Sequence, residues 1–223
     1  MAINWKLMDA KLQWADEGRL LVELPEDQAG DQAGAIAREK PRVPPGQTLT
    51  KGFPVLSIDD NPLVRRRDWQ LVLGGHVRRK IHWDWQDFQT APQQPWQTDI
   101  HCVTGWSKLD TLWHGVSSQA IINAVQPLPG AKFVTLRSYD GYATSLDMAD
   151  FCHEGVFLAS HYDGQPLTRE HGGPVRLIVP HLYLWKSAKW LRQIWFTDKE
   201  HRGTWEARGY HRRGDPWRQE RYE

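Results

Sequence analysis

The chain has 223 residues, of which 40% are hydrophobic and 25% are charged, and its formal net charge is +1. These values predict one large folded domain and give no electrostatic reason to expect a nucleic acid or a membrane surface as partner. Two cysteines are too few for a disulfide framework. No apolar stretch approaches the roughly 20 residues that span a bilayer, and the N-terminus lacks a signal-peptide pattern. We therefore expect a cytoplasmic protein.

The first forty residues differ in composition from the rest of the chain. The apolar run 20–24 predicts a helix or a strand, and the stretch 26–37, rich in Gly, Ala, Gln and Asp, is typical of a flexible linker. The proline-rich stretch 41–46 indicates an extended entry into the main domain. We therefore divide the chain into an N-terminal arm, residues 1–40, and a domain, residues 41–223.

Strand signals dominate the domain. Apolar and polar residues alternate over 69–73, and Gly74-Gly75 follows, which predicts a β-hairpin that continues into 76–80. One short helical turn is predicted over 83–88. The thirteen tryptophans are expected in core and cavity walls, where each indole N–H needs a partner. Further strands are predicted at 100–104, 133–138, 156–159 and 175–179.

Helical signals are fewer and shorter. The segment 118–125 is a plausible helix that Ser117 or Ser118 can cap, and Ser145 can cap a short helix that ends at Phe151. The strands do not alternate regularly with helices. This pattern predicts the α+β class, with strand-rich mixed sheets and short helices, rather than a doubly wound sheet.

Cys102 lies at the end of the predicted strand 100–104, with polar and aromatic neighbours. A thiol in such a place is a buried small hydrophobe, a nucleophile or a soft metal ligand. His101 is a poor partner for a nucleophile, because adjacent residues of a strand point to opposite faces. A structural zinc site is unfavoured, since Cys102 and Cys152 are far apart and neither belongs to a C-x-x-C pair. The other candidate histidine partners are His114, His153, His161 and His171.

A glycine-containing loop late in the chain carries a candidate anion ligand. His171 and Gly172-Gly173 precede an apolar strand that contains Arg176. The glycines would let backbone amides approach a ligand closely. A guanidinium beside a buried run needs an anionic partner, and phosphate suits its fork of donors. The alternative for Arg176 is a structural salt bridge.

The loop 186–189 follows soon afterwards and contains Lys186, Ser187 and Lys189. Lys189 can bind a phosphate as a point charge. The alternative is a solvated turn. Taken together, a thiolate, a His/Arg loop and a basic loop would suit an anionic, phosphate-bearing cofactor with a soft metal.

At this point the chain resembles a known family, the sulfite oxidase superfamily with its molybdopterin-binding oxidoreductase domain. More narrowly, it is similar to the small stand-alone sulfite oxidase-like proteins, and the match covers about residues 41–223. The resemblance implies a sulfite oxidase-type fold. The matching segments are 44–47, 53–56, 69–71, 99–107, 140–142, 164–167, 171–176, 186–189, 209–211 and 215–217.

The resemblance implies roles for particular residues. Cys102 would be the single protein thiolate on molybdenum, and the protein would perform two-electron oxygen-atom transfer on a small substrate. No haem-binding segment is visible, so the resemblance implies a separate electron-transfer partner; the sequence makes no prediction of oligomeric state. The residues that would contact the molybdopterin are Lys51, Gly52, Phe53, Ser138, His171, Arg176, Ser187, Ala188 and Lys189.

Two departures from the family bear on the substrate, which could be sulfite-like, a sulfoxide or an N-oxide. Sulfite-oxidising members have an arginine near the stretch that corresponds to 48–51, whereas this chain has none there, and Trp106 follows the cysteine in place of a basic cluster. A pocket with Trp106, His114, Tyr139 and His161 would be aromatic and neutral to weakly basic, which would suit a sulfoxide or an N-oxide.

Two other functions stay open on the residues alone: a thiol hydrolase that uses Cys102 with a histidine, and a non-enzymatic binding module on the same fold. The C-terminal tail is rich in arginine, but acidic residues interrupt it. A solvated or packed tail is therefore favoured over a nucleic-acid site. The tail arginines are Arg208, Arg212, Arg213, Arg218 and Arg221.

Overall fold

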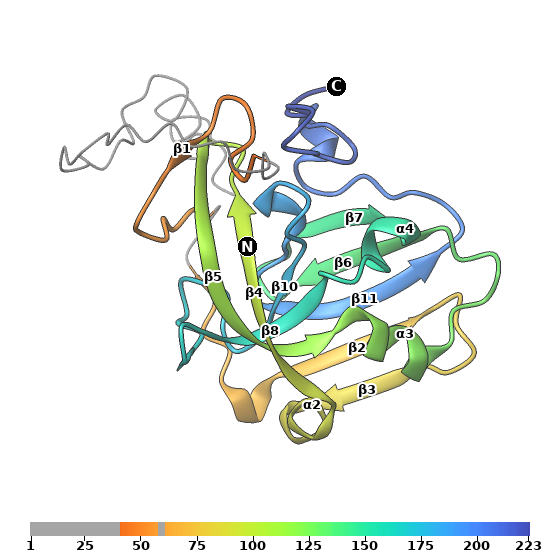
Figure 1. Cartoon of the computed structure of the whole chain (residues 1–223). Helices are drawn as coiled ribbons and strands as arrows, with labels where there is room; N and C mark the ends of the chain where they lie inside the picture. Colours follow the sequence, from red (N-terminus) through yellow and green to blue (C-terminus); the bar gives the residue numbers. More distant parts are fainter. Residues whose placement is uncertain (1–40, 58–60) are drawn as a thin grey trace, which may run out of the picture.

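The structure is a computed structural model that describes residues 41–57 and 61–223. In this part of the chain, two β-sheets pack against each other, with short helices at their ends (Figure 1). The prediction of strand-rich mixed sheets in the α+β class is confirmed. The predicted elements of the N-terminal arm lie outside the described residues, and the boundary at residue 40 stays a prediction. No helix in the described ranges is both long and apolar enough to cross a membrane.

The first sheet has six strands among the described residues, and β5 is its longest member. Strand β1 pairs with β5 in parallel, whereas β4 and β8 pair with β5 in antiparallel fashion. The strands are β1 (Thr48–Leu49), β4 (Gln93–His101), β5 (Trp106–Ser117), β8 (Phe157–Tyr162), β9 (Gln165–Pro166) and β10 (Arg176–Ile178).

The second sheet has five strands within the described residues, in the order β3-β2-β11-β6-β7. Strand β11 is parallel to β2 and antiparallel to β6, so this sheet is also mixed. The strands are β2 (Gln70–Gly75), β3 (Ile81–Asp84), β6 (Phe133–Ser138), β7 (Ala143–Asp147) and β11 (Leu191–Thr197).

Short helical segments connect the strands. Ser117 caps α3, because its Oγ accepts a hydrogen bond from the amide of Ala120 at 3.1 Å. Asp84 caps α2 and places this helix two residues after the predicted turn. The segments are α2 (Trp85–Thr90), α3 (Ser118–Val125), α4 (Met148–Phe151) and the 3-10 turns η1 (Arg66–Asp68), η2 (Leu184–Lys186) and η3 (Glu206–Arg208).

Three local predictions need correction. The strand predicted at 100–104 ends at His101, because the hydrogen bond from the Gly105 amide to the Cys102 carbonyl closes a turn before β5. The hairpin exists, but its second strand begins at Ile81 and the stretch 76–80 is a loop. Backbone hydrogen bonds from Arg78 and Arg79 to the end of α3 hold this loop away from β2. Ser145 does not cap α4, because it lies within β7, opposite Thr135 of β6.

The main core lies between the two sheets. Leu71 and Leu73 of β2 share one buried cluster with Val116 of β5 and Leu158 of β8. Fully buried Trp69 belongs to this cluster, and its indole N–H donates to the carbonyl of Leu191 at 3.0 Å. The core therefore fixes the strand ends that carry the candidate site.

Candidate cofactor site

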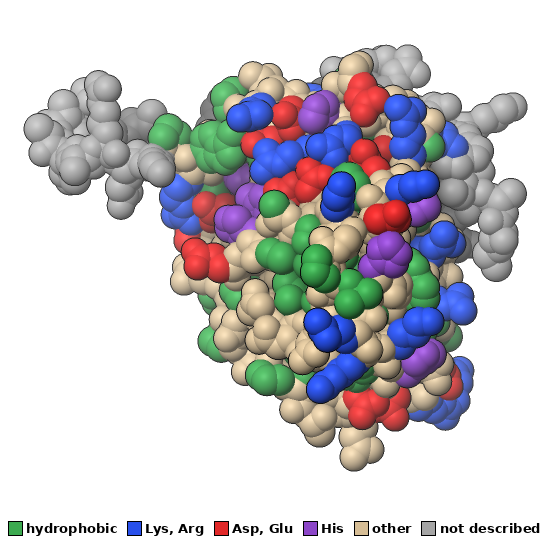
Figure 2. All heavy atoms as spheres, turned by 90° about the vertical axis from the view of Figure 1, so that its right-hand side faces the viewer, with side chains coloured by type: hydrophobic (Ala, Val, Ile, Leu, Met, Phe, Trp, Pro, Cys, Tyr) green, Lys and Arg blue, Asp and Glu red, His purple; other side chains and the backbone are tan. Residues whose placement is uncertain are grey.

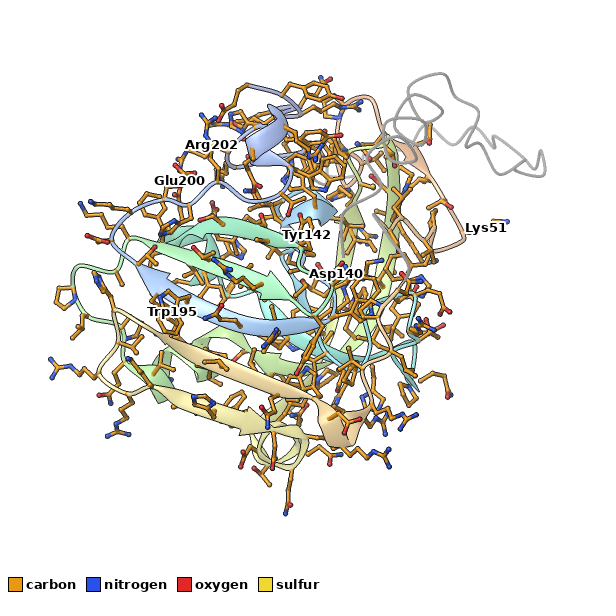
Figure 3. The ribbon with its side chains drawn as sticks, turned by 180° about the vertical axis from the view of Figure 1, so that it is seen from behind. Lys51, Asp140, Tyr142, Trp195, Glu200 and Arg202 are labelled. Carbon is orange, nitrogen blue, oxygen red and sulfur yellow. The ribbon has the colours of Figure 1, made fainter. Side chains whose placement is uncertain are left out.

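A cavity brings together six segments that are far apart in the sequence. They are the stretch 53–57, the turn after β4, the turn after β6, the loop before β10, the loop around η2 and the C-terminal segment near η3. Figure 3 shows Asp140 and Tyr142, from the turn after β6, in the middle of the molecule, where they contribute to the cavity wall. The cavity holds most of the residues that the sequence predicted for a cofactor.

Cys102 lies at the tip of a tight turn between β4 and β5. Its amide donates to the carbonyl of Trp106 at 2.8 Å, and its carbonyl accepts from the amide of Gly105 at 3.0 Å. Gly105 has a φ of +93°, a conformation that glycine adopts without steric cost. The cysteine is 6% exposed and lines the cavity, as expected for a thiol at a loop tip.

The surroundings of the sulfur do not favour a free nucleophile. Burial raises the pKa of the Cys102 thiol, although a hydrogen bond from Thr104 lowers it in part. The Thr104 hydroxyl donates to Sγ at 3.1 Å. No histidine nitrogen within the described ranges hydrogen-bonds to this sulfur, so the geometry offers no Cys–His pair for a hydrolase.

Three polar side chains outside the cavity lining, Gln47, His101 and Ser107, form hydrogen bonds at the Cys102 turn. Gln47 Nε2 donates to the carbonyl of Cys102 at 3.1 Å, and Ser107 Oγ donates to Gln47 Oε1 at 3.3 Å. His101 Nδ1 lies 2.8 Å from Ser107 Oγ, and burial lowers the pKa of this histidine. His101 is therefore engaged with Ser107, in line with the prediction that it is a poor partner for Cys102.

Arg176 is a buried cation in the cavity wall. Its guanidinium donates to the carbonyls of His171 at 2.9 Å and Ser187 at 3.1 Å. No carboxylate pairs with it in the part of the chain that the structure describes, so the predicted alternative of a structural salt bridge is not found there. Burial lowers the pKa of Arg176 to about 9, which still leaves the group charged at neutral pH. A buried guanidinium with only neutral acceptors fits an anionic ligand.

His171 lies next to this cation and stacks on Phe53, with ring centroids 4.1 Å apart. Its Nε2 lies 3.1 Å from the carbonyl of Phe53, and its Nδ1 lies 3.0 Å from the hydroxyl of Thr168. Burial lowers its pKa, and the nearby charges of Arg176 and Lys189 lower it further. A neutral imidazole at pH 7 therefore lies beside the anion site.

The loop 186–189 is not a solvated turn. Lys189 Nζ donates to the carbonyl of Leu56 at 2.8 Å and to Ser57 Oγ at 2.9 Å, and it lines the cavity with Ser187 and Ala188. Lys186 has no exposed surface and points into the core instead. The two lysines of this loop thus have separate roles.

The two glycines before Arg176 allow close packing against Lys189 and the backbone of Leu167 rather than against a ligand. Gly172 has a φ of +98°, and a Cβ there would lie 2.8 Å from the Cβ of Lys189. A Cβ on Gly173 would lie 2.3 Å from the carbonyl oxygen of Leu167. Their amides donate to the carbonyls of Arg169 and Thr168. The expectation that these amides approach a ligand is therefore not supported by the geometry.

Lys51 and Gly52 lie outside the cavity wall. Both are exposed, and Figure 3 shows the Lys51 side chain at the molecular edge, directed away from the protein. The carbonyl of Lys51 accepts a hydrogen bond from Lys108, which holds this stretch on the surface beside β5. The predicted roles of these two residues in cofactor binding have no geometric support.

The predicted aromatic substrate pocket is only partly present. Trp106 lines the cavity. His114 and His161 face each other across β5 and β8, with ring centroids 5.9 Å apart, and neither lines the cavity. Tyr139 donates its hydroxyl proton to the carbonyl of Gln70 at 3.0 Å, on the other sheet. Strand pairing thus separates residues that the sequence placed in one pocket.

A second aromatic wall was not predicted. Tyr142, Trp185, Trp205 and Tyr210 line the cavity beside Ser138. Among the described residues, the buried atoms Ser138 Oγ and Trp185 Nε1 have no hydrogen-bond partner. Tyr142 and Tyr210 do lie in segments that carry the family resemblance, but only the fold brings them to one cavity.

Three of the C-terminal arginines, Arg212, Arg213 and Arg218, pair with acidic side chains. Arg212 donates to Asp147 at 2.8 Å, and Arg213 to Asp150 at 3.0 Å and Asp215 at 2.9 Å. Figure 2 shows acidic and basic side chains interleaved across the upper part of one face of the molecule. The sequence favoured a solvated or packed tail, and the structure shows both: Arg213 is partly buried, whereas Arg218 is largely exposed. The absence of a nucleic-acid partner stays a prediction.

Comparison with known families identifies this arrangement. The family profile described as "Oxidoreductase molybdopterin binding domain" matches residues 58–205. The chain belongs to this family. The predictions of a molybdopterin-binding oxidoreductase and of a molybdenum cofactor are thereby confirmed.

Relatives of the molybdopterin-binding domain differ in length and in what is known of them. The chain is 44% identical over 182 residues to the uncharacterized oxidoreductase YuiH of Bacillus subtilis and spans 92% of that protein. It is 31% identical to a putative protein-methionine-sulfoxide reductase subunit, YedZ1, of Azospira oryzae, and 30% identical to the catalytic subunit MsrP of Ralstonia nicotianae. Those matches include 74% and 64% of this chain, but only 64% and 47% of the relatives.

A solved structure supports the fold. The sulfane dehydrogenase SoxCD from Paracoccus pantotrophus matches with a TM-score of 0.58 and 18% identity. The match covers 67% of this chain and 42% of the SoxCD chain. This likeness confirms the fold of two mixed sheets with short helices.

The residues of the cavity fit the molybdenum cofactor. Cys102 offers a soft sulfur ligand, and the buried guanidinium of Arg176 offers charge and donors for a phosphate. The unpartnered Ser138 Oγ and Trp185 Nε1 offer further polar atoms to a ligand, which buried groups require.

Proposed function

We propose that this molybdopterin-binding domain is a reductase that removes the oxygen atom from a sulfoxide in a two-electron reaction. The observation that carries the proposal is the shared cavity of a soft thiol, Cys102, and a buried cation without a carboxylate partner among the described residues, Arg176. The names of the relatives YedZ1 and MsrP support the choice of a sulfoxide.

Cys102 is the protein ligand of the metal in this proposal. Arg176, at the start of β10, and Lys189, in the loop around η2, hold the phosphate of the pterin, because both are cations of the cavity wall. His171 orients the pterin as a neutral imidazole. The other residues that would contact the cofactor are Phe53, Ser138, Ser187 and Ala188, all of which line the cavity.

When bound, the cofactor supplies a metal that accepts and donates two electrons and exchanges an oxygen atom. The net reaction takes two electrons and two protons and converts a sulfoxide into a thioether and water. The protein itself positions the cofactor and the substrate and excludes water from the cavity. The rings of Phe53 and Trp106 pack edge to face, with their centroids 6.2 Å apart. Both line the cavity with Cys102 and form an apolar wall for the substituents on the substrate sulfur.

Sulfite is a poorer substrate for this cavity. To bind sulfite, the cavity needs a cationic side chain besides those that bind the cofactor phosphate. The stretch 48–51 has no arginine in this chain. The cavity cations Arg176 and Lys189 are assigned to the phosphate. A neutral sulfoxide with apolar substituents therefore suits the wall of Phe53, Val103 and Trp106 better than an inorganic anion.

A separate electron-transfer protein supplies the electrons in this proposal, and the reaction takes place in the cytoplasm. The names of the relatives YedZ1 and MsrP include the word subunit, which supports the need for a partner. The chain spans about half the length of MsrP from Ralstonia nicotianae.

The experiment that tests the substrate uses holoenzyme from a host that makes molybdopterin. We would measure reduction of methionine sulfoxide blocked at its amino and carboxyl groups, and of trimethylamine N-oxide, with reduced methyl viologen, and oxidation of sulfite with ferricyanide. We expect the sulfoxide to have the highest kcat/KM and Cys102→Ser to abolish turnover. Faster turnover of sulfite or of the N-oxide by molybdenum-loaded protein would overturn the sulfoxide proposal.

A further inference from the structure

The sulfur of Cys102 accepts one side-chain hydrogen bond. Thr104 Oγ1 lies 3.1 Å from Cys102 Sγ, and Thr104 also lines the cavity. Within the described part of the chain, no other side-chain donor hydrogen-bonds to this sulfur. A hydroxyl therefore contacts the atom that would bind the metal, from a position two residues along the chain.

The backbone fixes the geometry of this contact. Both residues lie in one tight turn, closed by the hydrogen bond from the Gly105 amide to the Cys102 carbonyl. Gln47 Nε2 holds the same carbonyl, and the Thr48 amide donates to the carbonyl of Gly105 at 2.8 Å. The turn is thus held from two sides, and the position of the hydroxyl is set by the fold.

We propose that Thr104 is a positioning residue that tunes the metal through the hydrogen bond to Cys102 Sγ. The proposal rests on the proposed function, in which Cys102 is the metal ligand. A hydrogen bond to a ligating thiolate withdraws electron density from the sulfur and weakens its donation to the metal. Weaker donation stabilises the reduced metal more than the oxidised metal, so the hydroxyl raises the reduction potential of the bound cofactor.

The test compares three forms of the holoenzyme. Thr104→Val has nearly the same shape and lacks the hydroxyl, whereas Thr104→Ser retains the hydroxyl and serves as the matched control. For each form we would measure molybdenum per chain, the energy of the thiolate-to-metal absorption band and the midpoint potential. We expect Thr104→Val to shift the band to longer wavelength and to lower the midpoint potential, and Thr104→Ser to keep both at the wild-type values.

The outcomes separate this proposal from the proposed function. Molybdenum-loaded Thr104→Val with an unchanged band and potential overturns the tuning role, and so does a Thr104→Ser protein that shows the shifts of Thr104→Val. If Thr104→Val fails to hold molybdenum, Thr104→Ala provides the same two readouts with a smaller side chain. The proposed function would instead be contradicted if the wild-type holoenzyme showed no thiolate-to-metal band that is lost in Cys102→Ser.

Discussion

Lys186 and Glu206 form an ion pair inside the protein, between the loop around η2 and the C-terminal segment. Lys186 has no exposed surface, and its ammonium also donates to the carbonyl of Ser145 at 2.9 Å. Lys186 therefore joins three parts of the chain: η2, strand β7 and the C-terminal segment. It sets the position of Ser187 and Lys189, which come soon after Lys186 and line the cavity.

We expect Lys186→Met to destabilise the cofactor-free protein by about 3–5 kcal/mol, because it leaves the buried Glu206 carboxylate without its cation. The measurement is the free energy of unfolding from a denaturant titration. Arg202→Ala is the matched control, since the Arg202–Glu223 pair is exposed and should contribute about 0–1 kcal/mol. Equal effects of the two substitutions would contradict a structural role for the buried pair.

Arg176→Gln tests the anion site. The substitution keeps a side chain that can hydrogen-bond but removes the charge. A hydrogen bond to a charged group contributes about 1.5–3 kcal/mol of binding free energy. We therefore expect the molybdenum and pterin content per chain to fall about 10- to 100-fold. Arg137→Gln is the control, because Arg137 is exposed on β6 and lies outside the cavity. Full cofactor content in Arg176→Gln protein would remove Arg176 from the binding site.

Ser138→Ala separates ligand binding from folding. Because Ser138 Oγ is buried without a hydrogen-bond partner among the described residues, its loss should leave the stability of the cofactor-free protein unchanged or raise it by about 1 kcal/mol. Cofactor content should fall. Ser107→Ala is the comparison, since Ser107 bonds to Gln47 and His101 and its removal should cost about 1 kcal/mol. A loss of stability in Ser138→Ala with full cofactor content would assign Ser138 to the fold.

Asp150 makes the stability dependent on pH at the acid end. Burial raises the pKa of this carboxyl, but hydrogen bonds from His181 and Arg213 outweigh burial and hold the pKa at about 2. The pKa in the folded protein is thus below the ordinary value of 3.8. The resulting stabilisation is present above about pH 4 and is lost as the pH falls towards 2.

We expect Asp150→Asn to lower stability by about 1–2 kcal/mol at pH 7, after allowance for solvent screening of the Arg213 contact. The difference from the wild type should shrink between pH 4 and pH 2. Unfolding titrations at several pH values give the measurement, and a difference that stays constant across this range would exclude the Asp150 carboxyl as its source.

The sequence predicted the fold where local patterns dominate. The helix 118–125 was predicted because a serine cap is a local signal, and the strand signal of 133–138 predicted β6 over its observed residues. The second strand of the first hairpin was misplaced, because hydrogen bonds from residues 78 and 79 to the end of α3 decide where the loop ends. Long-range contacts of this kind leave no local pattern.

The candidate site was predicted in part for the same reasons. Cys102, His171 and Arg176 lie in recognisable motifs and meet in the cavity. Lys51 did not join them, because the edge of β5 holds it at the surface. Trp185 was missed as a cavity residue, because no local pattern shows that it lines the cavity with Trp205 and Tyr210 of the C-terminal segment. Its indole nitrogen has no hydrogen-bond partner among the described residues, which only the structure shows.

The most direct test of the account is the molybdenum content of protein from a host that makes molybdopterin, measured by mass spectrometry for the wild type and for Cys102→Ser. We predict about one molybdenum per wild-type chain, with a thiolate-to-metal absorption band that is lost in Cys102→Ser. Folded wild-type protein without molybdenum, or a Cys102→Ser variant that keeps both the metal and the band, would contradict the assignment of Cys102 as the metal ligand.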